Sequence, residues 1–235
     1  MTHEIVILAA GLGSRLGRAL PKPLTELADG RTIMQQQLEN IHAAFDDARI
    51  SIVVGYKLES IIEAFPENNF VYNEAYDQTN TSKSLLRALI NTPKNEGVLW
   101  MNGDVVFDPQ ILVQAAALIE ANQSFVTVNT AKVSDEEVKY TINAEGYIDE
   151  LSKTVPQASA LGEAVGINYI AGHDKQKLIN QLKAVDDQAY FERGIELAIQ
   201  YDGLLVEPMD ISVRNYYAVE VDFAADLTVA NAALK

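Results

Sequence analysis

Short apolar runs and helical spacings alternate along the first 130 residues. Buried strands are expected at the apolar runs 3–8, 50–54 and 97–101. A further strand is expected at 124–130, and a shorter one at 69–72. Between these runs, apolar residues recur every three or four positions, as on one face of a helix. This spacing predicts a helix through Met34, Leu38, Ile41 and Phe45, and further helices at 57–65, 82–90 and 111–119. Such alternation predicts parallel βαβ units with helices on both faces of a central sheet.

The pattern changes after residue 131. Residues 139–143 and 147–152 flank Ala144-Glu145-Gly146 and predict a β-hairpin. The rest of the chain predicts a strand at 166–170, helices at 174–185 and 188–200, a strand at 217–221 and a closing helix at 223–234. No linker or repeat interrupts the pattern, so residues 1–235 are interpreted as a single domain with an inserted β-rich subregion.

Composition narrows the class of protein. The apolar content of 48% over 235 residues is enough for a sizeable core. The net charge of -15 would repel nucleic acid, and the absence of cysteine excludes disulfides, zinc–thiolate sites and thiol catalysis. No apolar run is long enough to span a membrane, and the first residues lack the basic region of a signal peptide. We therefore expect a cytoplasmic protein that binds neither nucleic acid nor membrane; its oligomeric state is left open.

One glycine-rich segment departs from the acidic composition. It follows the first predicted strand, and it contains Gly11, Gly13 and Gly17 together with Arg15, Arg18 and Lys22. Two prolines, Pro21 and Pro23, enclose Lys22 and stiffen the backbone around it. Backbone N–H groups exposed at glycines, with fixed cations beside them, form a site for phosphate groups. The segment therefore predicts a binding site for a nucleoside triphosphate.

Other phosphate-binding signatures fit this segment poorly. In the dinucleotide fingerprint the third glycine would stand one position earlier than Gly17, and Pro21 would break the long helix that the fingerprint opens. The Walker pattern G-x-x-x-x-G-K-[ST] is absent from the sequence. An ordinary turn between a strand and a helix would explain Gly11 and Gly13, but it would not require Arg15 or a lysine between two prolines.

The segment Gly11-Leu12-Gly13-Ser14-Arg15, followed by Pro21-Lys22-Pro23-Leu24, resembles a family signature. The signature is the G-x-G-x-R…P-K-P-L pattern of nucleotidylyltransferases that make nucleoside diphosphate sugars and alcohols. Asn73 with Tyr76, Asn80, Ser84 and Leu85 resembles a segment of the phosphocholine cytidylyltransferase branch. Three later segments resemble the superfamily in the same order: Gly103-Asp104; Gly162-Glu163 with Gly166-Ile167; and Glu220 with Asp222, Asp226 and Leu227.

The resemblance implies an architecture and a reaction. The fold would be a Rossmann-like, mixed, mainly parallel central sheet with helices on both faces and a small β-rich acceptor-binding subregion. Residues 1–131 would form the nucleotide-binding half, and residues 132–235 would bind the acceptor and complete the metal site. A phosphate oxygen of the acceptor would attack the α-phosphorus of a nucleoside triphosphate, CTP being favoured, and pyrophosphate would leave.

Roles follow for the residues that match the signature. Arg15 and Lys22 are the expected catalytic residues, because both reactants are anions and need fixed positive charge. The expected nucleotide-binding residues are Ala9, Ala10, Gly11, Leu12, Gly13, Ser14, Asn80, Ser84 and Gly103. Asp104 and Asp222 each follow a predicted strand and are the expected ligands of Mg²⁺, which prefers hard oxygen donors. Alternatively, Asp104 stabilises a turn, while Asp222 and Asn80 cap helices.

The acceptor site is expected in the second half of the chain. A phosphorylated amino alcohol such as phosphocholine needs an aromatic and acidic site for its cation, and the candidates are Glu163, Tyr169, Tyr190 and Glu192. Two alternatives stay open. One is a sugar-1-phosphate nucleotidylyltransferase that uses UTP, dTTP or GTP, and the other is a non-catalytic, nucleotide-binding regulatory module.

Overall fold

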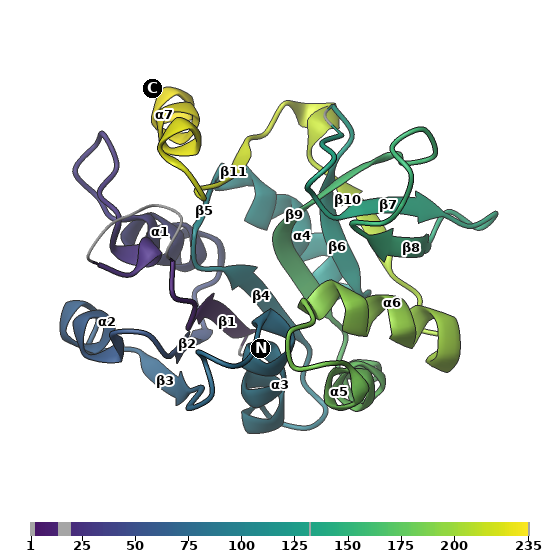
Figure 1. Ribbon diagram of the computed structural model, residues 1–235, viewed down its shortest axis with the longest axis horizontal. Helices are drawn as coiled ribbons and strands as arrows, with labels where there is room; N and C mark the ends of the chain where they lie inside the picture. Colours follow the sequence, from purple (N-terminus) through teal and green to yellow (C-terminus); the bar gives the residue numbers. More distant parts are fainter. Residues whose placement is uncertain (1–2, 14–19, 132, 235) are drawn as a thin grey trace.

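A mixed β-sheet forms the centre of the molecule (Figure 1). The computed structural model describes residues 3–13, 20–131 and 133–234. Within these ranges the main path of the sheet has the strand order β10-β6-β9-β4-β1-β2-β3, and β7 joins β8 to β9. The strands are β1 (His3–Ala9), β2 (Ala48–Val54), β3 (Asn69–Tyr72), β4 (Val98–Asn102), β6 (Phe125–Asn129), β7 (Lys139–Ile142), β8 (Ile148–Ser152), β9 (Gly162–Ile170) and β10 (Glu207–Asp210).

Most strands on the main path run in one direction. β1 pairs in parallel with β2 and β4, β2 with β3, and β6 with β10. β9 runs antiparallel to both of its neighbours on this path, β4 and β6. The C-terminal ends of β1 and β4 therefore lie side by side at one edge of the sheet, where open α/β sheets bind ligands.

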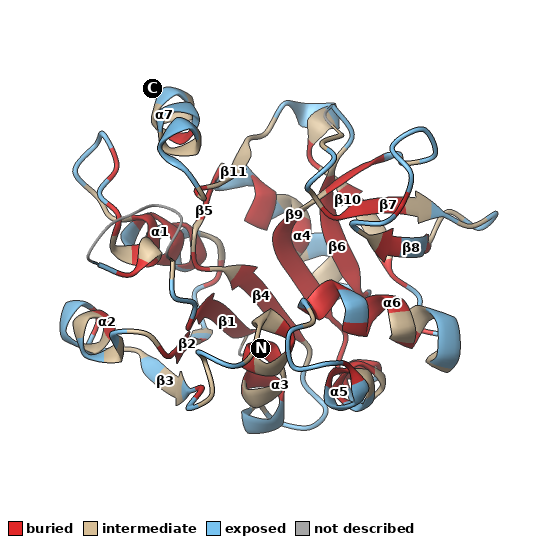
Figure 2. Cartoon of the chain, viewed as in Figure 1, coloured by how far each residue is buried: buried red, intermediate tan, exposed pale blue. Residues whose placement is uncertain are grey.

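Helices cover both faces of the sheet (Figure 2). Successive residues of β1 point to opposite faces: Ile5 and Ile7 pack in one hydrophobic core with α1, α2 and α4, whereas Val6 and Leu8 pack in a second core with α3, α5 and α6. The helices are α1 (Ile33–Ala44), α2 (Leu58–Ala64), α3 (Thr81–Asn91), α4 (Gln110–Glu120), α5 (Lys175–Ala184), α6 (Phe191–Asp202) and α7 (Ala224–Ala233). This arrangement confirms the fold class predicted from the sequence.

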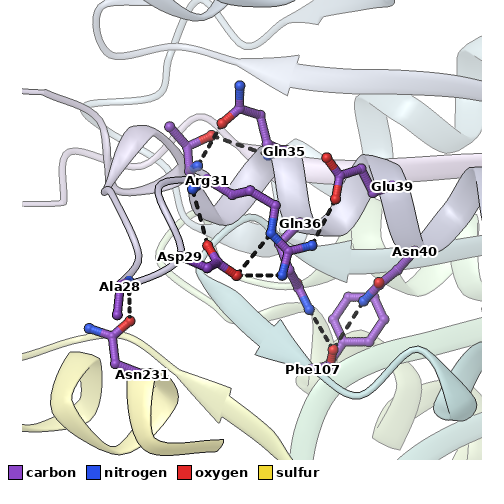
Figure 3. A network of polar contacts seen from close by, with 10 residues as sticks. Ala28, Asp29, Arg31, Gln35, Gln36, Glu39, Asn40, Phe107 and Asn231 are labelled. Carbon is purple, nitrogen blue, oxygen red and sulfur yellow. Dashed lines mark hydrogen bonds and ion pairs between the residues drawn. The ribbon is translucent and has the colours of Figure 1, made fainter. Parts of the chain in front are cut away.

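A second small sheet joins distant parts of the chain. β5 (Val105–Phe107) pairs antiparallel with β11 (Ala218–Glu220). Side-chain amides of α1 hold β5 in place, because Gln36 and Asn40 both donate to the Phe107 carbonyl oxygen, at 2.6 and 3.0 Å (Figure 3). On α7, the Asn231 Oδ1 atom accepts from the backbone N–H of Ala28 at 2.7 Å (Figure 3). The C-terminal segment is therefore tied to the N-terminal region.

The expected elements are present, with ends that differ by a few residues. β9 begins at Gly162, four residues before the expected start at 166. Two strands were not expected: β5 has only three residues, and β10 contains Pro208 between charged ends. Both gain their strand character from pairing with distant segments, which a local pattern does not reveal. In the described part of the chain, no helix has both the length and the apolar character needed to cross a membrane.

Candidate active site

A cleft of about 450 Å³ opens at the C-terminal edge of β1 and β4. It is lined by residues from the glycine-rich segment, from the turn after β4 and from the segment after β11. The loop before α3, the loop before β7 and the start of α6 complete its walls. Segments that are far apart in sequence thus meet around one space, as expected of a ligand site in an α/β fold.

Lys22 and two carboxylates form a compact group in the cleft, which we call the lysine–carboxylate cluster. The Lys22 Nζ atom lies 2.8 Å from Asp104 Oδ2 and also forms an ion pair with Asp222 Oδ1. Lys22 opens a short 3₁₀ helix that follows Pro21, so the backbone fixes where its side chain begins. Burial would lower the pKa of Lys22, but the two carboxylates outweigh this effect and raise it. Lys22 therefore carries a positive charge at neutral pH.

Backbone contacts fix both carboxylates. Gly103 donates to the Leu8 carbonyl at 2.9 Å, and a Cβ at position 103 would lie only 2.8 Å from that oxygen, so the close approach requires glycine. Val221 donates to the Asp104 carbonyl at 2.9 Å, which brings the segment of Asp222 alongside Asp104. The Asp226 carboxylate accepts from the backbone N–H groups of Asp222 and Phe223, at 3.1 and 2.7 Å.

The donor set of this cluster fits Mg²⁺. Asp104 and Asp222 present hard carboxylate oxygens to the same ammonium group. Across residues 3–13, 20–131 and 133–234, no group of three or more His, Asp or Glu side chains is arranged to hold a metal by itself. Magnesium commonly takes one or two protein carboxylates and completes its shell with substrate phosphates and water. Two converging carboxylates in the cleft that the glycine-rich segment lines match that requirement.

Most of the expected nucleotide-binding residues line the cleft. They are Ala9, Gly11, Leu12, Gly13, Asn80 and Gly103. Asn80 also caps α3, because its Oδ1 atom accepts from the Thr81 N–H at 2.8 Å. Ala10 and Ser84 do not line the cleft: Ser84 is buried and accepts from Asn73 at 3.1 Å, and the Ala10 carbonyl accepts from Tyr56. Ser14 and Arg15 lie outside the described residues.

The four expected acceptor residues divide into two pairs. Tyr190 and Glu192, at the start of α6, line the cleft. Tyr169 lies near the end of β9, which runs antiparallel to β4, so it is at the opposite edge of the sheet, where it stacks on Phe125. Glu163 is buried, does not line the cleft and accepts from the Ser134 N–H at 3.0 Å. The residue types suit a cation site, but the strand direction turns Tyr169 away from it.

Several lining residues were not among the expected site residues. Glu136, Glu137 and Lys153 join Tyr190 and Glu192, and we call these five residues the acidic–aromatic group. The Lys153 Nζ atom lies 4.9 Å from the centre of the Tyr190 ring. The acidic run Asp135-Glu136-Glu137 beside the predicted hairpin was a usable signal. Lys153 carried no such signal in the sequence, because a single lysine after a strand is common and points to no function.

Glu220 lines the cleft within electrostatic range of both the lysine–carboxylate cluster and the acidic–aromatic group. Its Oε1 atom accepts from Asn102 at 2.7 Å. Burial, and then the charge of Asp104, raise the pKa of Glu220. Gly166 lies against this carboxylate with a φ of +74°, and a Cβ there would lie 2.5 Å from Glu220 Oε1. Burial likewise raises the pKa of Glu192 to about 7. The cleft thus holds two carboxyl groups that are easier to protonate than usual.

Comparisons with known proteins identify a family and a fold. The family model of the MobA-like NTP transferase domain matches residues 5–167. The CMP-5'-(3-aminopropyl)phosphonate synthase of Streptomyces rubellomurinus is 36% identical over 126 residues. That match covers 50% of this chain and 19% of the relative, so the chain spans about a fifth of the relative's length.

Solved structures share the whole fold. The CTP:phosphocholine cytidylyltransferase of Streptococcus pneumoniae superimposes with a TM-score of 0.78 at 17% identity, covering 100% of both chains. A UDP-glucose pyrophosphorylase superimposes with a TM-score of 0.73 at 16% identity, covering 100% of this chain and 98% of the other. At such low identity these likenesses establish the architecture of the chain.

Proposed function

Because the chain belongs to the MobA-like NTP transferase domain family, we propose that it transfers CMP from CTP to a phosphorylated amino alcohol such as phosphocholine, and that pyrophosphate is released. The observation that carries the proposal is the cleft, which combines the lysine–carboxylate cluster with the acidic–aromatic group. The first can bind phosphates, and the second offers carboxylates and an aromatic ring to a cation. Residues 1–131 would then supply the nucleotide site, and residues 132–235 the acceptor site and Asp222.

In this proposal Lys22 holds the α-phosphate. Attack by one anion on another is slowed by charge repulsion, so a fixed cation at the reacting phosphate lowers the barrier. The ammonium of Lys22 is already held in the cleft by Asp104 and Asp222. The backbone from Gly11 to Gly13 lines the same space and can donate N–H groups to the other phosphates. The proposal retains Arg15 and the backbone of Ser14 as further phosphate ligands.

Asp104 and Asp222 are the residues that would hold Mg²⁺. When bound, the ion would supply Lewis acidity and a template for the phosphate oxygens. The protein's own contribution is the placement of the two carboxylates, from the turn after β4 and the segment after β11, on one side of the phosphate site.

The acidic–aromatic group supports an acceptor with a positive charge. Glu136, Glu137 and Glu192 bring carboxyl groups to the cleft, and Tyr190 presents an aromatic ring. A cationic acceptor favours the ionised form of Glu192, and an aromatic face adds a cation–π contact. The name of the Streptomyces relative contains an aminopropyl phosphonate, which joins an amine to a phosphorus acid as phosphocholine joins an ammonium to a phosphate.

A sugar-1-phosphate nucleotidylyltransferase is the second candidate. The observation in its favour is the shared fold with a UDP-glucose pyrophosphorylase. Thr79, Asn80 and Gln188 line the cleft and can hydrogen-bond hydroxyl groups of a sugar. In this case UTP, dTTP or GTP would replace CTP.

Pyrophosphate release across a substrate panel tests the proposal. The protein is incubated with Mg²⁺, each nucleoside triphosphate in turn, and phosphocholine, 3-aminopropylphosphonate or glucose 1-phosphate. We expect the highest turnover with CTP and an amine-bearing acceptor. Preference for glucose 1-phosphate would select the second candidate, and no release with any pair would favour a regulatory nucleotide-binding module.

Lys22→Ala tests the assigned role of the lysine. Loss of the cation at the reacting phosphate should lower kcat by about 100-fold or more. Circular dichroism should show an intact fold, and Lys183→Ala, at an exposed position of α5, is the matched control. Near-normal turnover in Lys22→Ala would contradict the mechanism.

A further inference from the structure

Lys139 is a buried lysine that does not line the cleft. It is the first residue of β7, and its residue is only 2% exposed. Its Nζ atom donates to three backbone carbonyls, those of Asp135 at 2.9 Å, Glu137 at 3.2 Å and Lys153 at 2.8 Å. An ammonium group has three N–H donors, so these contacts use its full capacity.

The three carbonyls belong to two loops that enter the cleft. Loop 133–138 precedes β7 and carries Glu136 and Glu137, whereas Lys153 follows β8. Glu136, Glu137 and Lys153 are three of the five members of the acidic–aromatic group. Lys139 therefore connects, from outside the cleft, the backbones that carry most of that group.

Neighbouring contacts fix the other side of loop 133–138. Glu163 lies opposite Lys139 in the pairing of β7 with β9, and its Oε2 atom accepts from the Ser134 N–H at 3.0 Å. Ala164 donates to the Val138 carbonyl at 2.8 Å. The loop is thus held by both its N–H and its C=O groups, although its side chains Asp135 and Glu136 are exposed.

We propose that Lys139 is a positioning residue for the acceptor: its ammonium fixes loop 133–138 and Lys153, and through them the places of Glu136, Glu137 and Lys153 in the cleft. This inference rests on the proposed function, since it assigns the acidic–aromatic group to the acceptor. Hydrogen bonds from a charged donor are stronger than neutral ones, so one buried cation can hold three carbonyls that would otherwise move apart.

The position of Lys139 predicts an effect on one substrate only. The lysine–carboxylate cluster is built from Lys22, the turn after β4 and the segment after β11, and none of these contacts Lys139 in the hydrogen bonds of the described residues. Loss of the Lys139 ammonium should therefore weaken acceptor binding and leave the nucleotide site unchanged.

Steady-state kinetics of Lys139→Met tests this separation. Methionine keeps an unbranched apolar chain but donates no hydrogen bond. We expect the KM for the acceptor to rise about tenfold or more, while the KM for the nucleotide and kcat at saturating acceptor change by less than about twofold. Lys139→Arg, which retains a buried cation with several donors, should restore most of the acceptor affinity. Lys183→Met is the matched control on the exposed face of α5.

Hydrogen exchange gives a readout that does not depend on turnover. In Lys139→Met, amides 134–138 and 153–155 should exchange faster, while those of β1 and β4 keep their protection. If this variant does not fold, Lys139→Gln, which keeps an amide donor, should show the same selective effect at smaller size.

Three outcomes would overturn the inference. If Lys139→Met had wild-type turnover and an unchanged KM for the acceptor, this inference would be overturned while the proposed function would stand. A parallel rise of both KM values together with a lower melting temperature would show a merely structural role. Wild-type protein that releases no pyrophosphate with any substrate pair would overturn the proposed function and this inference with it.

Discussion

Glu192 carries a buried carboxyl group that titrates near neutral pH. Burial raises its pKa to about 7; a hydrogen bond with its own backbone and the charge of Lys153 oppose the rise, and the charge of Glu137 adds to it. Its Oε2 atom is buried and has no hydrogen-bond partner among the described residues. A carboxyl group in this position is poorly stabilised when ionised unless a cation lies beside it. The proposed acceptor would supply that cation.

The stability of the free protein should therefore depend on the pH in a way that Glu192→Gln removes. The unfolded carboxyl has a pKa near 4.5, so between pH 4.5 and 7 it ionises in the unfolded state but stays protonated in the folded state. The contribution of Glu192 to wild-type stability falls over this window as the pH rises, and it levels off once the pH has passed the folded pKa of about 7. The difference in the free energy of unfolding between Glu192→Gln and the wild type should shift in favour of the variant by roughly 3 kcal/mol from pH 4.5 to pH 8. Urea unfolding at each pH measures the difference, and a constant difference would contradict the prediction.

Single residues also show where sequence reasoning ends. Lys22 was chosen for its place between two prolines in the glycine-rich signature and Asp104 for its place after a buried strand, and the structure brings them together. Tyr169 and Glu163 were chosen as acceptor residues because a cation needs aromatic and acidic groups, and neither lines the cleft. Tyr169 lies at the opposite edge of the sheet because β9 runs antiparallel to β4, whereas Glu163, at the other end of β9, is buried and accepts from the Ser134 N–H. A single sequence does not contain that direction in any local pattern.

Helix α1 contributes to the site without entering the cleft. Gln37 is fully buried, and its Nε2 atom donates to the carbonyls of Asn102 and Val105, both at 2.8 Å. These carbonyls flank Gly103 and Asp104, so Gln37 fixes the turn that carries Asp104, one of the two proposed metal ligands. The sequence predicted α1 well, because its apolar face repeats regularly over three turns. The sequence did not show that its glutamines bind backbone carbonyls of β5 and of the turn before it, because those partners are distant in sequence.

Two glutamines of α1 make a matched pair for testing this role. Gln37→Met removes both bonds to the turn, so we expect a stability loss of about 2 kcal/mol and a clear fall in kcat, because Asp104 is less firmly placed. Gln36→Met removes one bond to the Phe107 carbonyl, which still accepts from Asn40. It should reduce stability by a similar or smaller amount and leave kcat nearly unchanged. Thermal melting and pyrophosphate release distinguish the two, and equal kcat values would argue against the positioning role.

At the scale of the whole molecule, the site depends on a long-range pairing. Asp104 and Asp222 are separated by more than half of the described chain, and the antiparallel pairing of β5 with β11 brings them together. From the sequence, the two carboxylates could converge on one ion if the strands before them were neighbours, but the sequence did not show whether they were. It did not reveal β5, and pairings between distant short strands depend on tertiary packing, not on propensity. The strands β1, β2 and β4 at the centre of the main sheet were predictable because each contains an apolar run, whereas β10 at its edge was not.

The C-terminal helix should control metal binding from outside the cleft. At its start, Asp226 accepts from the backbone N–H groups of Asp222 and Phe223, and Asn231 further along holds Ala28. Asp226→Ala removes the first contact and frees the backbone of Asp222, a proposed metal ligand. We expect a loss of about 1 kcal/mol in stability and a rise of about tenfold in the Mg²⁺ concentration for half-maximal turnover. Thr228→Ala, which removes only an exposed bond to Ala224 within the same helix, should leave the Mg²⁺ requirement unchanged. If both variants had the Mg²⁺ dependence of the wild type, the cap on Asp222 would have no part in forming the metal site.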